Sequence, residues 1–385
     1  MASNNSSQLV AMMMISKTEA TRRKPLVMVA IQASAMVVMM VVGALANGVI
    51  CHCILKHTSL RTVTNIFIMN LATTDFLVCI FCMPFALISC IVDEWVFGDL
   101  MCRLEGFLLS MLCISSILTL VLIAIDRYMA IKYPLKYCTH LTNSISVFML
   151  STIWCYAAIC SMLPALGWGS GYVYVREENI CRPEFGTPSK DSGFTSFLFT
   201  SAFAVPFSVL AFLYLSILWT ARKQFRQVHV AKNIIQVKPQ TDESTKNTGK
   251  RTILPEFDNT CTEVTSATNT TRSLGFSTSK NRKHRRKSKT RGFKILLLIV
   301  AVFIMCWSPH FVLIFYSSIA HVKIPLEIRV ITTWLAFLNS TMNPFLYGFL
   351  NGKFRSGLKR FWGNKILCCW LWKGNEESRA FHINR

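Results

Sequence analysis

Long apolar stretches separated by short polar segments make up most of the chain. The clearest, from Gly106 to Ile125, is twenty residues long and carries no charge. At about 1.5 Å of rise per residue, such a helix covers roughly 30 Å, the thickness of a bilayer's hydrocarbon core. Similar stretches predict an all-α membrane protein with a seven-transmembrane helix bundle, over residues 25–55, 66–91, 106–125, 145–166, 195–219, 295–320 and 328–350.

Prolines interrupt several of these stretches. Pro206, Pro309 and Pro344 each remove a backbone hydrogen bond from a predicted helix. In a membrane such breaks are tolerated where neighbouring helices, hydroxyl groups and water satisfy the freed carbonyl groups. We expect kinks at these positions that act as pivots.

Composition and charge agree with a membrane protein. Hydrophobic residues make up 52% of the 385 residues and charged residues 16%, which is too apolar for a soluble globule. The net charge of +22 would suggest a nucleic-acid partner if one soluble face carried it. However, eighteen of the 41 Lys and Arg residues fall between Arg222 and Lys294. This clustering is typical of a cytoplasmic loop, so the expected partner is the lipid bilayer and no nucleic acid.

Loop charges predict the orientation. Basic residues follow the first, third, fifth and seventh spans, while Arg22, Arg23 and Lys24 oppose them but are outnumbered. The positive-inside rule places the N-terminus outside and the C-terminus in the cytoplasm. We expect an extracellular segment over 1–24 without a cleaved signal peptide, with glycosylation sequons at Asn4 and Asn5.

Two further segments lie on the cytoplasmic side. The third inner loop, about 221–292 within the bundle region 25–350, is rich in Lys, Ser and Thr, and we expect disorder over most of it. Residues 351–385 follow as an amphipathic eighth helix and a tail. In that tail Cys368 and Cys369 are candidates for palmitoylation.

A few polar residues inside the spans point to a switch. Arg127 keeps its charge under burial, and it either pairs locally with Asp126 or swings toward another helix. The alternative is a fixed interfacial salt bridge. Trp307 lies next to the kink at Pro309, where a ligand pressing on the ring could swing the inner end of the sixth helix. An ordinary aromatic core contact is the alternative here.

These motifs appear in a fixed order along the chain. They are Asn47; Leu71 to Asp75; Cys102 with Asp126, Arg127 and Tyr128; Trp154; Cys181; Pro206 with Tyr214; Cys306 to Pro309; and Asn343 to Tyr347. Together they resemble the rhodopsin-like (class A) G-protein-coupled receptors, as an orphan-type member near the opsin and amine-receptor branch. The resemblance implies a plasma-membrane receptor that binds an extracellular ligand and signals to heterotrimeric G proteins by helix rearrangement, with arrestin and receptor kinases as further partners.

The resemblance also implies roles for individual residues. The activation switch would comprise Asp126, Arg127, Tyr128, Tyr214, Trp307, Pro309, Asn343, Pro344 and Tyr347. A sodium ion would be held in the inactive state by Asp75, Ser116, Asn339, Ser340 and Asn343, with no other metal or cofactor expected. For Asp75 the alternative is a buried protonated carboxyl group. A disulfide is expected between Cys102 and Cys181 on the oxidising side, with Cys90 and Cys160 as rivals.

Ligand type is less clear from the residues. The position that carries the amine-binding Asp in amine receptors is Leu109, and the retinal-linking Lys of opsins is replaced by Phe337. A typical protonated amine and a covalent retinal are therefore not expected. Glu105 stands where many opsins have a counterion, although pairing with Arg103 or Arg329 is the favoured interpretation. By resemblance the ligand pocket comprises Glu105, Leu109, Ser110, Cys113, Leu198, Phe199, His310, Phe311, Ile314, Thr333 and Phe337.

Other function classes fit less well. A transporter or channel is the alternative, but repeated halves and rings of pore-lining charge are not evident. An enzyme is not expected, because neither a nucleophile with its base nor a metal-binding pair appears within the spans.

One departure from the family pattern predicts basal activity. Where many resembling receptors have an acid that holds the switch arginine, the sixth helix has Lys289. Repulsion between Lys289 and Arg127 would favour the outward position of that helix and so ligand-independent signalling. Retention of Arg127 by Asp126 alone is the alternative.

Overall fold

The computed structural model describes residues 24–169, 171–184, 191–236, 279–320, 322 and 324–350. The glycosylation sites Asn4 and Asn5, the eighth helix, and Cys368 and Cys369 lie outside these residues. So do the side chains of Lys289 and Tyr347, although both residues belong to described helices.

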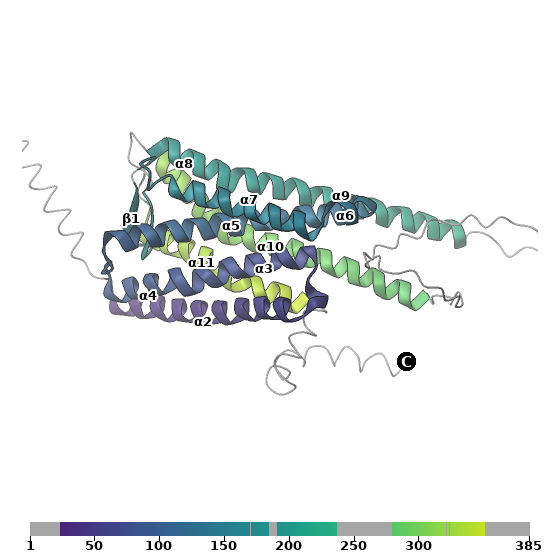
Figure 1. Cartoon of the computed structure of the whole chain (residues 1–385), viewed down its shortest axis with the longest axis horizontal. Helices are drawn as coiled ribbons and strands as arrows, with labels where there is room; N and C mark the ends of the chain where they lie inside the picture. The colour runs from purple at the N-terminus through teal and green to yellow at the C-terminus, as the bar shows by residue number, and fades with distance from the viewer. Residues whose placement is uncertain are drawn as a thin grey trace, which may run out of the picture.

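Long helices run side by side and form one bundle, as Figure 1 shows. Their bounds are α2 Leu26–Lys56, α3 Val63–Leu77, η2 Val78–Cys82, α4 Met83–Val92, α5 Gly98–Lys132, α7 Asn143–Met162, α8 Asp191–Phe199, η3 Thr200–Ala204, α9 Val205–Gln236, α10 Ser279–Ala320 and α11 Leu326–Leu350. The short elements are η1 Thr58–Leu60, α6 Pro134–His140 and the strands β1 Tyr172–Val175 and β2 Ile180–Pro183. The strands lie at one end of the bundle, which we call the hairpin end, and α6 lies at the other, the α6 end.

The seven spans predicted from the apolar pattern are confirmed. Six described segments are long and apolar enough to cross a membrane. The seventh, α11, packs against α10 and α2 and closes the bundle. It is less apolar because it turns amides and hydroxyl groups inward, among them Asn339, Ser340 and Asn343.

Local sequence explains where several helices begin and end. At the α6 end, the hydroxyl groups of Thr62 and Thr142 accept hydrogen bonds from the backbone of Asn65 and Ile145, and so cap α3 and α7. At the hairpin end, Asp93 terminates α4 in a left-handed conformation with φ of 62°. The second and fifth spans each contain a π-helical segment, η2 and η3, before the chain continues as an α-helix.

Three predicted boundaries need correction. The fourth span ends at Met162 rather than near 166, because Pro164 follows and has no backbone N–H to continue the helical hydrogen bonds. The third inner loop is narrower than 221–292, because α9 continues to Gln236 and α10 already begins at Ser279. Lys, Arg and Gln are good helix formers, so both helices extend past the bundle, as Figure 1 shows.

The central helix is α5. It packs against α3, α7, α9 and both strands. In its most apolar stretch of 18 residues 61% of the residues are buried, compared with 22% in the corresponding stretch of α2. The hairpin sits directly on it: Tyr172 lies against Gly106, where an added Cβ would come within 2.4 Å of the tyrosine ring. The Tyr172 hydroxyl group donates a hydrogen bond of 2.7 Å to the carbonyl group of Ser161 in α7. Glycine at 106 therefore allows the hairpin to pack between α5 and α7.

Candidate functional site

A closed set of polar contacts surrounds Arg127 at the α6 end. The Arg127 guanidinium donates from Nε to Asp126 Oδ2 at 2.8 Å, and its Nη2 donates to Thr64. Asp126 Oδ2 also accepts from Thr64 at 2.8 Å, and Oδ1 accepts from the Tyr137 hydroxyl group at 2.7 Å. We call Thr64, Asp126, Arg127 and Tyr137 the arginine cage. It joins α3, α5 and α6, and both carboxylate oxygens of the fully buried Asp126 are satisfied.

Tyr137 is suited to its place in the cage. Burial, followed by the charge of Asp126, raises the pKa of the Tyr137 hydroxyl group to about 12. The phenol thus stays neutral and remains a hydrogen-bond donor throughout the physiological pH range. Sequence reasoning missed both Thr64 and Tyr137, since a lone Thr and a lone Tyr near polar segments carry no spacing signal.

The other predicted switch residues are placed as follows. Tyr214 of α9 is 5% exposed and lies within the electrostatic reach of Arg127. Tyr128 turns instead to Lys132, which donates to its hydroxyl group at 2.6 Å. Pro309 and Pro344 lie inside α10 and α11, as predicted.

A second buried polar site lies deeper in the bundle. Asn343 donates to Asp75 at 2.8 Å, linking α11 to α3, and Asn47 ties α2 to the backbone of Ser340. Asp75 is 1% exposed and forms no salt bridge in the described part of the chain. Within the described residues, buried side-chain oxygens without a hydrogen-bond partner remain on Ser116, Asn339 and Asn343. A carboxylate with unpartnered hydroxyl and amide oxygens is a donor set that fits a hard monovalent cation.

Aromatic rings connect Trp307 with the hairpin end. Trp307 of α10 lies 6.4 Å from Phe303 and 5.5 Å from Phe311, measured between ring centroids. Rings of η3 and α9 alternate with those of α10: Phe207 lies 5.3 Å from Phe303, and Phe203 lies 4.9 Å from Phe311. The column ends in a stacked pair, Phe199 and Phe315, at 3.9 Å. The spacing of four residues along both helices could have predicted this column.

Glu105 makes neither of the ion pairs expected for it. Its side chain accepts a hydrogen bond of 3.0 Å from the backbone N–H of Cys181 in β2. Arg103 pairs with Asp99 at 2.7 Å, and Arg329 faces Glu177 and Glu178 at 4.0 and 3.9 Å. The prediction of a Glu105 pair with Arg103 or Arg329 is therefore wrong, because those arginines point to acids outside the helix core.

The predicted disulfide between Cys102 and Cys181 is present, and its rivals Cys90 and Cys160 are free thiols. The bond fixes β2 to the start of α5, and so it holds Cys181 above Glu105.

Charged residues that sequence reasoning missed complete the hairpin end. Lys24 donates to Arg176 O at 2.8 Å and to Asn179 Oδ1 at 2.7 Å, while Arg176 pairs with Asp93 at 2.6 Å. Burial alone would raise the pKa of Asp93, but the hydrogen bond from Arg176 and the nearby Lys24 lower it below its usual value.

A second ionic group lies at the hairpin end. Arg182 donates twice to Glu178, both times at 2.9 Å, and Arg329 lies beside the same carboxylate. Burial acts to raise the pKa of Glu178, yet the charge and hydrogen bonds of Arg182, with Arg329, hold it below its usual value. His310, one turn from Trp307, is within electrostatic reach of this group.

The predicted ligand-pocket residues do not form one cluster. Leu109 and Phe337 share a buried cluster with Cys113 packed against it, and Phe311 belongs to the aromatic packing around Trp307. Leu198 instead packs in a separate cluster with Ile114 and Ala157. Thr333 uses its hydroxyl group within α11, bonded to Arg329 O at 3.1 Å. Ser110 and Ile314 are half-buried in α5 and α10, and Phe199 stacks in the aromatic column.

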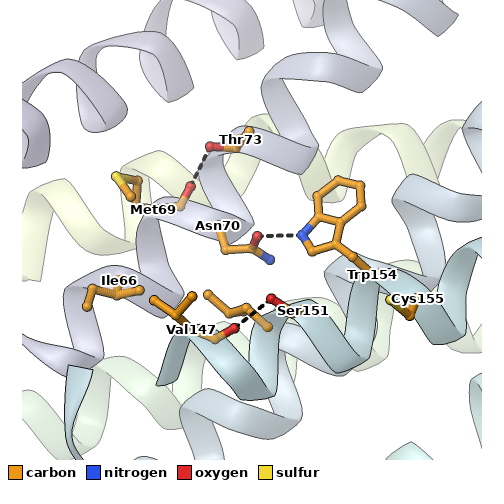
Figure 2. A pocket seen from close by; sticks show the side chains of 9 residues that line it. Ile66, Met69, Asn70, Thr73, Val147, Ser151, Trp154 and Cys155 are labelled. Carbon is orange, nitrogen blue, oxygen red and sulfur yellow. Dashed lines mark hydrogen bonds between the residues drawn. The ribbon is translucent and has the colours of Figure 1, made fainter. Parts of the chain in front are cut away.

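A groove of about 560 Å³ runs along the outside of the bundle between α3 and α7. Figure 2 shows the Trp154 indole donating to Asn70 at its centre, a hydrogen bond of 2.9 Å. The hydroxyl groups of Thr73 and Ser151 bond to backbone carbonyls of their own helices. The polar groups of the lining are therefore bonded within the protein, and the groove offers mainly apolar surface.

Comparison with known proteins identifies the family. The family described as "7 transmembrane receptor (rhodopsin family)" matches residues 46–347. The chain belongs to this receptor family. The receptor is 29% identical to neuropeptide FF receptor 2 of Rattus norvegicus over 81% of its own length and 68% of the relative's. It is 26% identical to the alpha-1A adrenergic receptor of Oryzias latipes, covering 83% of itself and 64% of that relative.

A solved structure supports the fold. Squid rhodopsin superposes on the receptor with a TM-score of 0.70 at 20% identity, covering 95% of this chain and 94% of that one. The family and its relatives make this a G-protein-coupled signalling receptor, a multi-pass plasma-membrane protein. The predictions of family, fold class and receptor function are confirmed.

Proposed function

We propose that this receptor carries an extracellular signal from the hairpin end to a heterotrimeric G protein at the α6 end. The N-terminus then lies outside and the C-terminus in the cytoplasm. Two features support this direction. The disulfide at the hairpin end suits an oxidising compartment, and Lys56, Arg61, Lys132 and Lys136 gather at the opposite end.

The arginine cage is the observation that carries the mechanism. Arg127 is held by Asp126 of its own helix, by Thr64 of α3 and, through Asp126, by Tyr137 of α6. Within the described side chains, α10 contributes nothing to the cage. Activation would free Arg127 to meet Tyr214 and Tyr347 and would expose a floor for the G protein. The hydrogen bonds of the cage thus stabilise the inactive conformation.

Resting activity follows from the same arrangement. The sixth helix has Lys289 at the position where an acid would form an ion pair with Arg127. Outward movement of the sixth helix therefore breaks no such ion pair. We propose that the receptor signals measurably without ligand. Arrestin and receptor kinases would then limit that signal at the cytoplasmic face.

Sodium would oppose this resting activity. The carboxylate of Asp75, with oxygens of Ser116, Asn339, Ser340 and Asn343, would hold the ion in the inactive state and supply a counter-charge to a buried acid. Replacing sodium by N-methylglucamine is expected to raise ligand-free signalling in the wild type and to have no effect in Asp75→Asn. Indifference of the wild type to the exchange would remove the ion from the account.

Nucleotide exchange tests the proposed function directly. Purified receptor in lipid discs is mixed with heterotrimeric G proteins, and binding of a non-hydrolysable GTP analogue is followed. Wild type is expected to accelerate exchange, while Arg127→Ala should fall to the receptor-free rate. Arg103→Ala, an exposed arginine at the hairpin end, is the matched control and should behave as wild type. Equal exchange with wild type and with empty discs would refute the proposal.

A further inference from the structure

Charge is distributed differently at the two ends of the receptor. At the hairpin end cations lie beside acids, as Arg176 lies beside Asp93 at 2.6 Å. At the α6 end the described side chains form one salt bridge, between Arg127 and Asp126, and that acid is fully buried. The exposed cations described at this end are Lys56, Arg61, Lys132, Lys136, Arg222 and Lys223. In the described part of this end, no exposed acid balances them.

Cations are most concentrated in the segments of α9 and α10 that extend past the bundle. Figure 1 shows both segments at the α6 end. We call residues 222–236 of α9 and 279–294 of α10 the basic arms. The α10 arm contains nine Lys and Arg residues and the α9 arm contains four, and neither helix has an Asp or Glu residue in its sequence. The positive charge of the arms is therefore not neutralised within their own helices.

Both arms begin where the apolar part of their helix ends. The candidate membrane span that includes most of α9 ends at Thr220, and the neighbouring Trp219 is 67% exposed. Lys223, one turn further, lies over the Trp219 ring, with Nζ 5.5 Å from the ring centroid. Exposed tryptophan and long cationic side chains are typical of the interface between hydrocarbon and headgroups. On α10, Lys294 directly precedes the apolar run from Ile295, so both arms start at the level of the lipid headgroups.

Like charges repeat along the α10 arm. Positions four residues apart are neighbours on a helix, and cations at such positions destabilise it when no acid lies between them. Such pairs are Arg282 and Arg286, Lys283 and Lys287, Arg285 and Lys289, and Lys287 and Arg291. The arm is helical nevertheless, as the good helix propensity of Lys and Arg favours. A polyanion bound along the arm would remove the repulsion and stabilise this helix.

The position of the arms indicates which polyanion fits. Because they start at the headgroup level, a charged lipid of the adjoining leaflet is held beside them by the bilayer itself. Clusters of cations directly beside a membrane span are typical of sites for anionic lipids. A headgroup with several phosphate groups neutralises several cations at once, and arginine can donate two parallel hydrogen bonds to one phosphate group. A lipid with a single negative charge does neither as well.

We propose that the basic arms bind the headgroup of a polyphosphoinositide in the cytoplasmic leaflet. The α10 arm supplies most of the charge, and Arg222 and Lys223 of the α9 arm face the same headgroup layer. Bound lipid stabilises the helical form of the α10 arm by reducing the repulsion along it. The choice of leaflet rests on the orientation proposed above, whereas the binding itself does not.

Competition between lipids tests the proposal. Purified full-length receptor in neutral maltoside micelles and potassium chloride is titrated into a trace of phosphatidylinositol 4,5-bisphosphate with a fluorophore on its acyl chain. Fluorescence anisotropy gives the apparent Kd. Unlabelled phosphatidylinositol 4,5-bisphosphate should compete about tenfold better than phosphatidylserine, because it neutralises more cations at once. It should also compete about tenfold better than soluble inositol trisphosphate, because the micelle holds the lipid beside the arms.

Two variants with the same loss of charge locate the site. The arm variant combines Arg282→Gln, Arg285→Gln and Arg286→Gln, which keep good helix formers in place. It should bind the labelled lipid about tenfold more weakly than wild type. The control combines Lys56→Gln, Arg61→Gln and Lys136→Gln, three exposed cations of the same end outside the arms, and should change the affinity less than threefold. Melting temperatures of both variants are compared with wild type to establish that the bundle is intact.

The salt dependence of the wild type is a measurement that needs no variant. Raising potassium chloride from about 50 to about 300 mM should weaken binding severalfold, because exposed charges are screened. Equal competition by phosphatidylserine, equal competition by soluble inositol trisphosphate, an affinity indifferent to salt, or the same loss in both variants would overturn the proposal. No G protein is present, so a failure here leaves the nucleotide-exchange result untouched, and a failure of exchange leaves this binding result standing.

Discussion

The two ends of the receptor treat a buried acid in opposite ways. At the α6 end, Asp126 has both oxygens satisfied by Thr64, Arg127 and Tyr137. At the hairpin end, Glu105 has one oxygen bonded to Cys181 and the other without a partner among the described residues. A saturated site holds one conformation, whereas an unsaturated site gains free energy when a partner arrives. At the α6 end, a change of conformation therefore has to break existing hydrogen bonds of Asp126. At the hairpin end, a new partner for Glu105 would add a hydrogen bond.

The largest effect is expected from the bond that positions the hairpin. Cys102→Ala and Cys181→Ala should each lower delivery to the cell surface severalfold, because loss of a native disulfide commonly costs about 2–5 kcal/mol. The double variant should be no worse than either single one, since both remove the same bond. Surface labelling of a tagged receptor measures this, with the free thiol variant Cys160→Ala as control. Normal delivery of either single variant would contradict the role given to the disulfide.

A second, smaller effect concerns the seat of the hairpin on α5. In Gly106→Ala the new Cβ would meet the Tyr172 ring at 2.4 Å, so the hairpin must shift, at a cost of roughly 1–3 kcal/mol. The melting temperature of the purified receptor should fall. In Gly48→Ala the nearest atom lies at 3.4 Å, and no comparable loss is expected. A Gly106→Ala receptor as stable as Gly48→Ala would show that Tyr172 does not hold the hairpin in place.

At the α6 end the expected effect is on activity. Tyr137→Phe removes one hydrogen bond to Asp126, worth about 1 kcal/mol, and so should raise ligand-free signalling by roughly fivefold. Tyr133→Phe changes a neighbouring phenol that does not contact Asp126 and should leave signalling unchanged. Cyclic-nucleotide and calcium reporters at matched surface levels would measure both. Reduced or unchanged activity in Tyr137→Phe would show that the cage does not restrain the receptor.

Much of this architecture could be predicted from the sequence, for reasons that differ between regions. Membrane spans are set by apolar length, and the partners Cys102 and Cys181 and the prolines inside α10 and α11 follow from motif order. The cage could be predicted only in its Asp126 and Arg127 part, because Thr64 and Tyr137 reach Asp126 from other helices. The environment of Glu105 could not be predicted either. A long arginine side chain can reach several acids, and the path of the hairpin determines with which acid each arginine pairs.

The most direct measurement compares ligand-free nucleotide exchange by wild type and by Lys289→Glu at matched receptor density. The acid would give the sixth helix a hold on Arg127 that the cage does not supply, an interaction of order 1 kcal/mol near a wet surface. The account predicts exchange above the receptor-free rate for the wild type and a severalfold lower rate for the variant. A wild type no faster than empty discs, or a Lys289→Glu receptor as active as wild type, would contradict it.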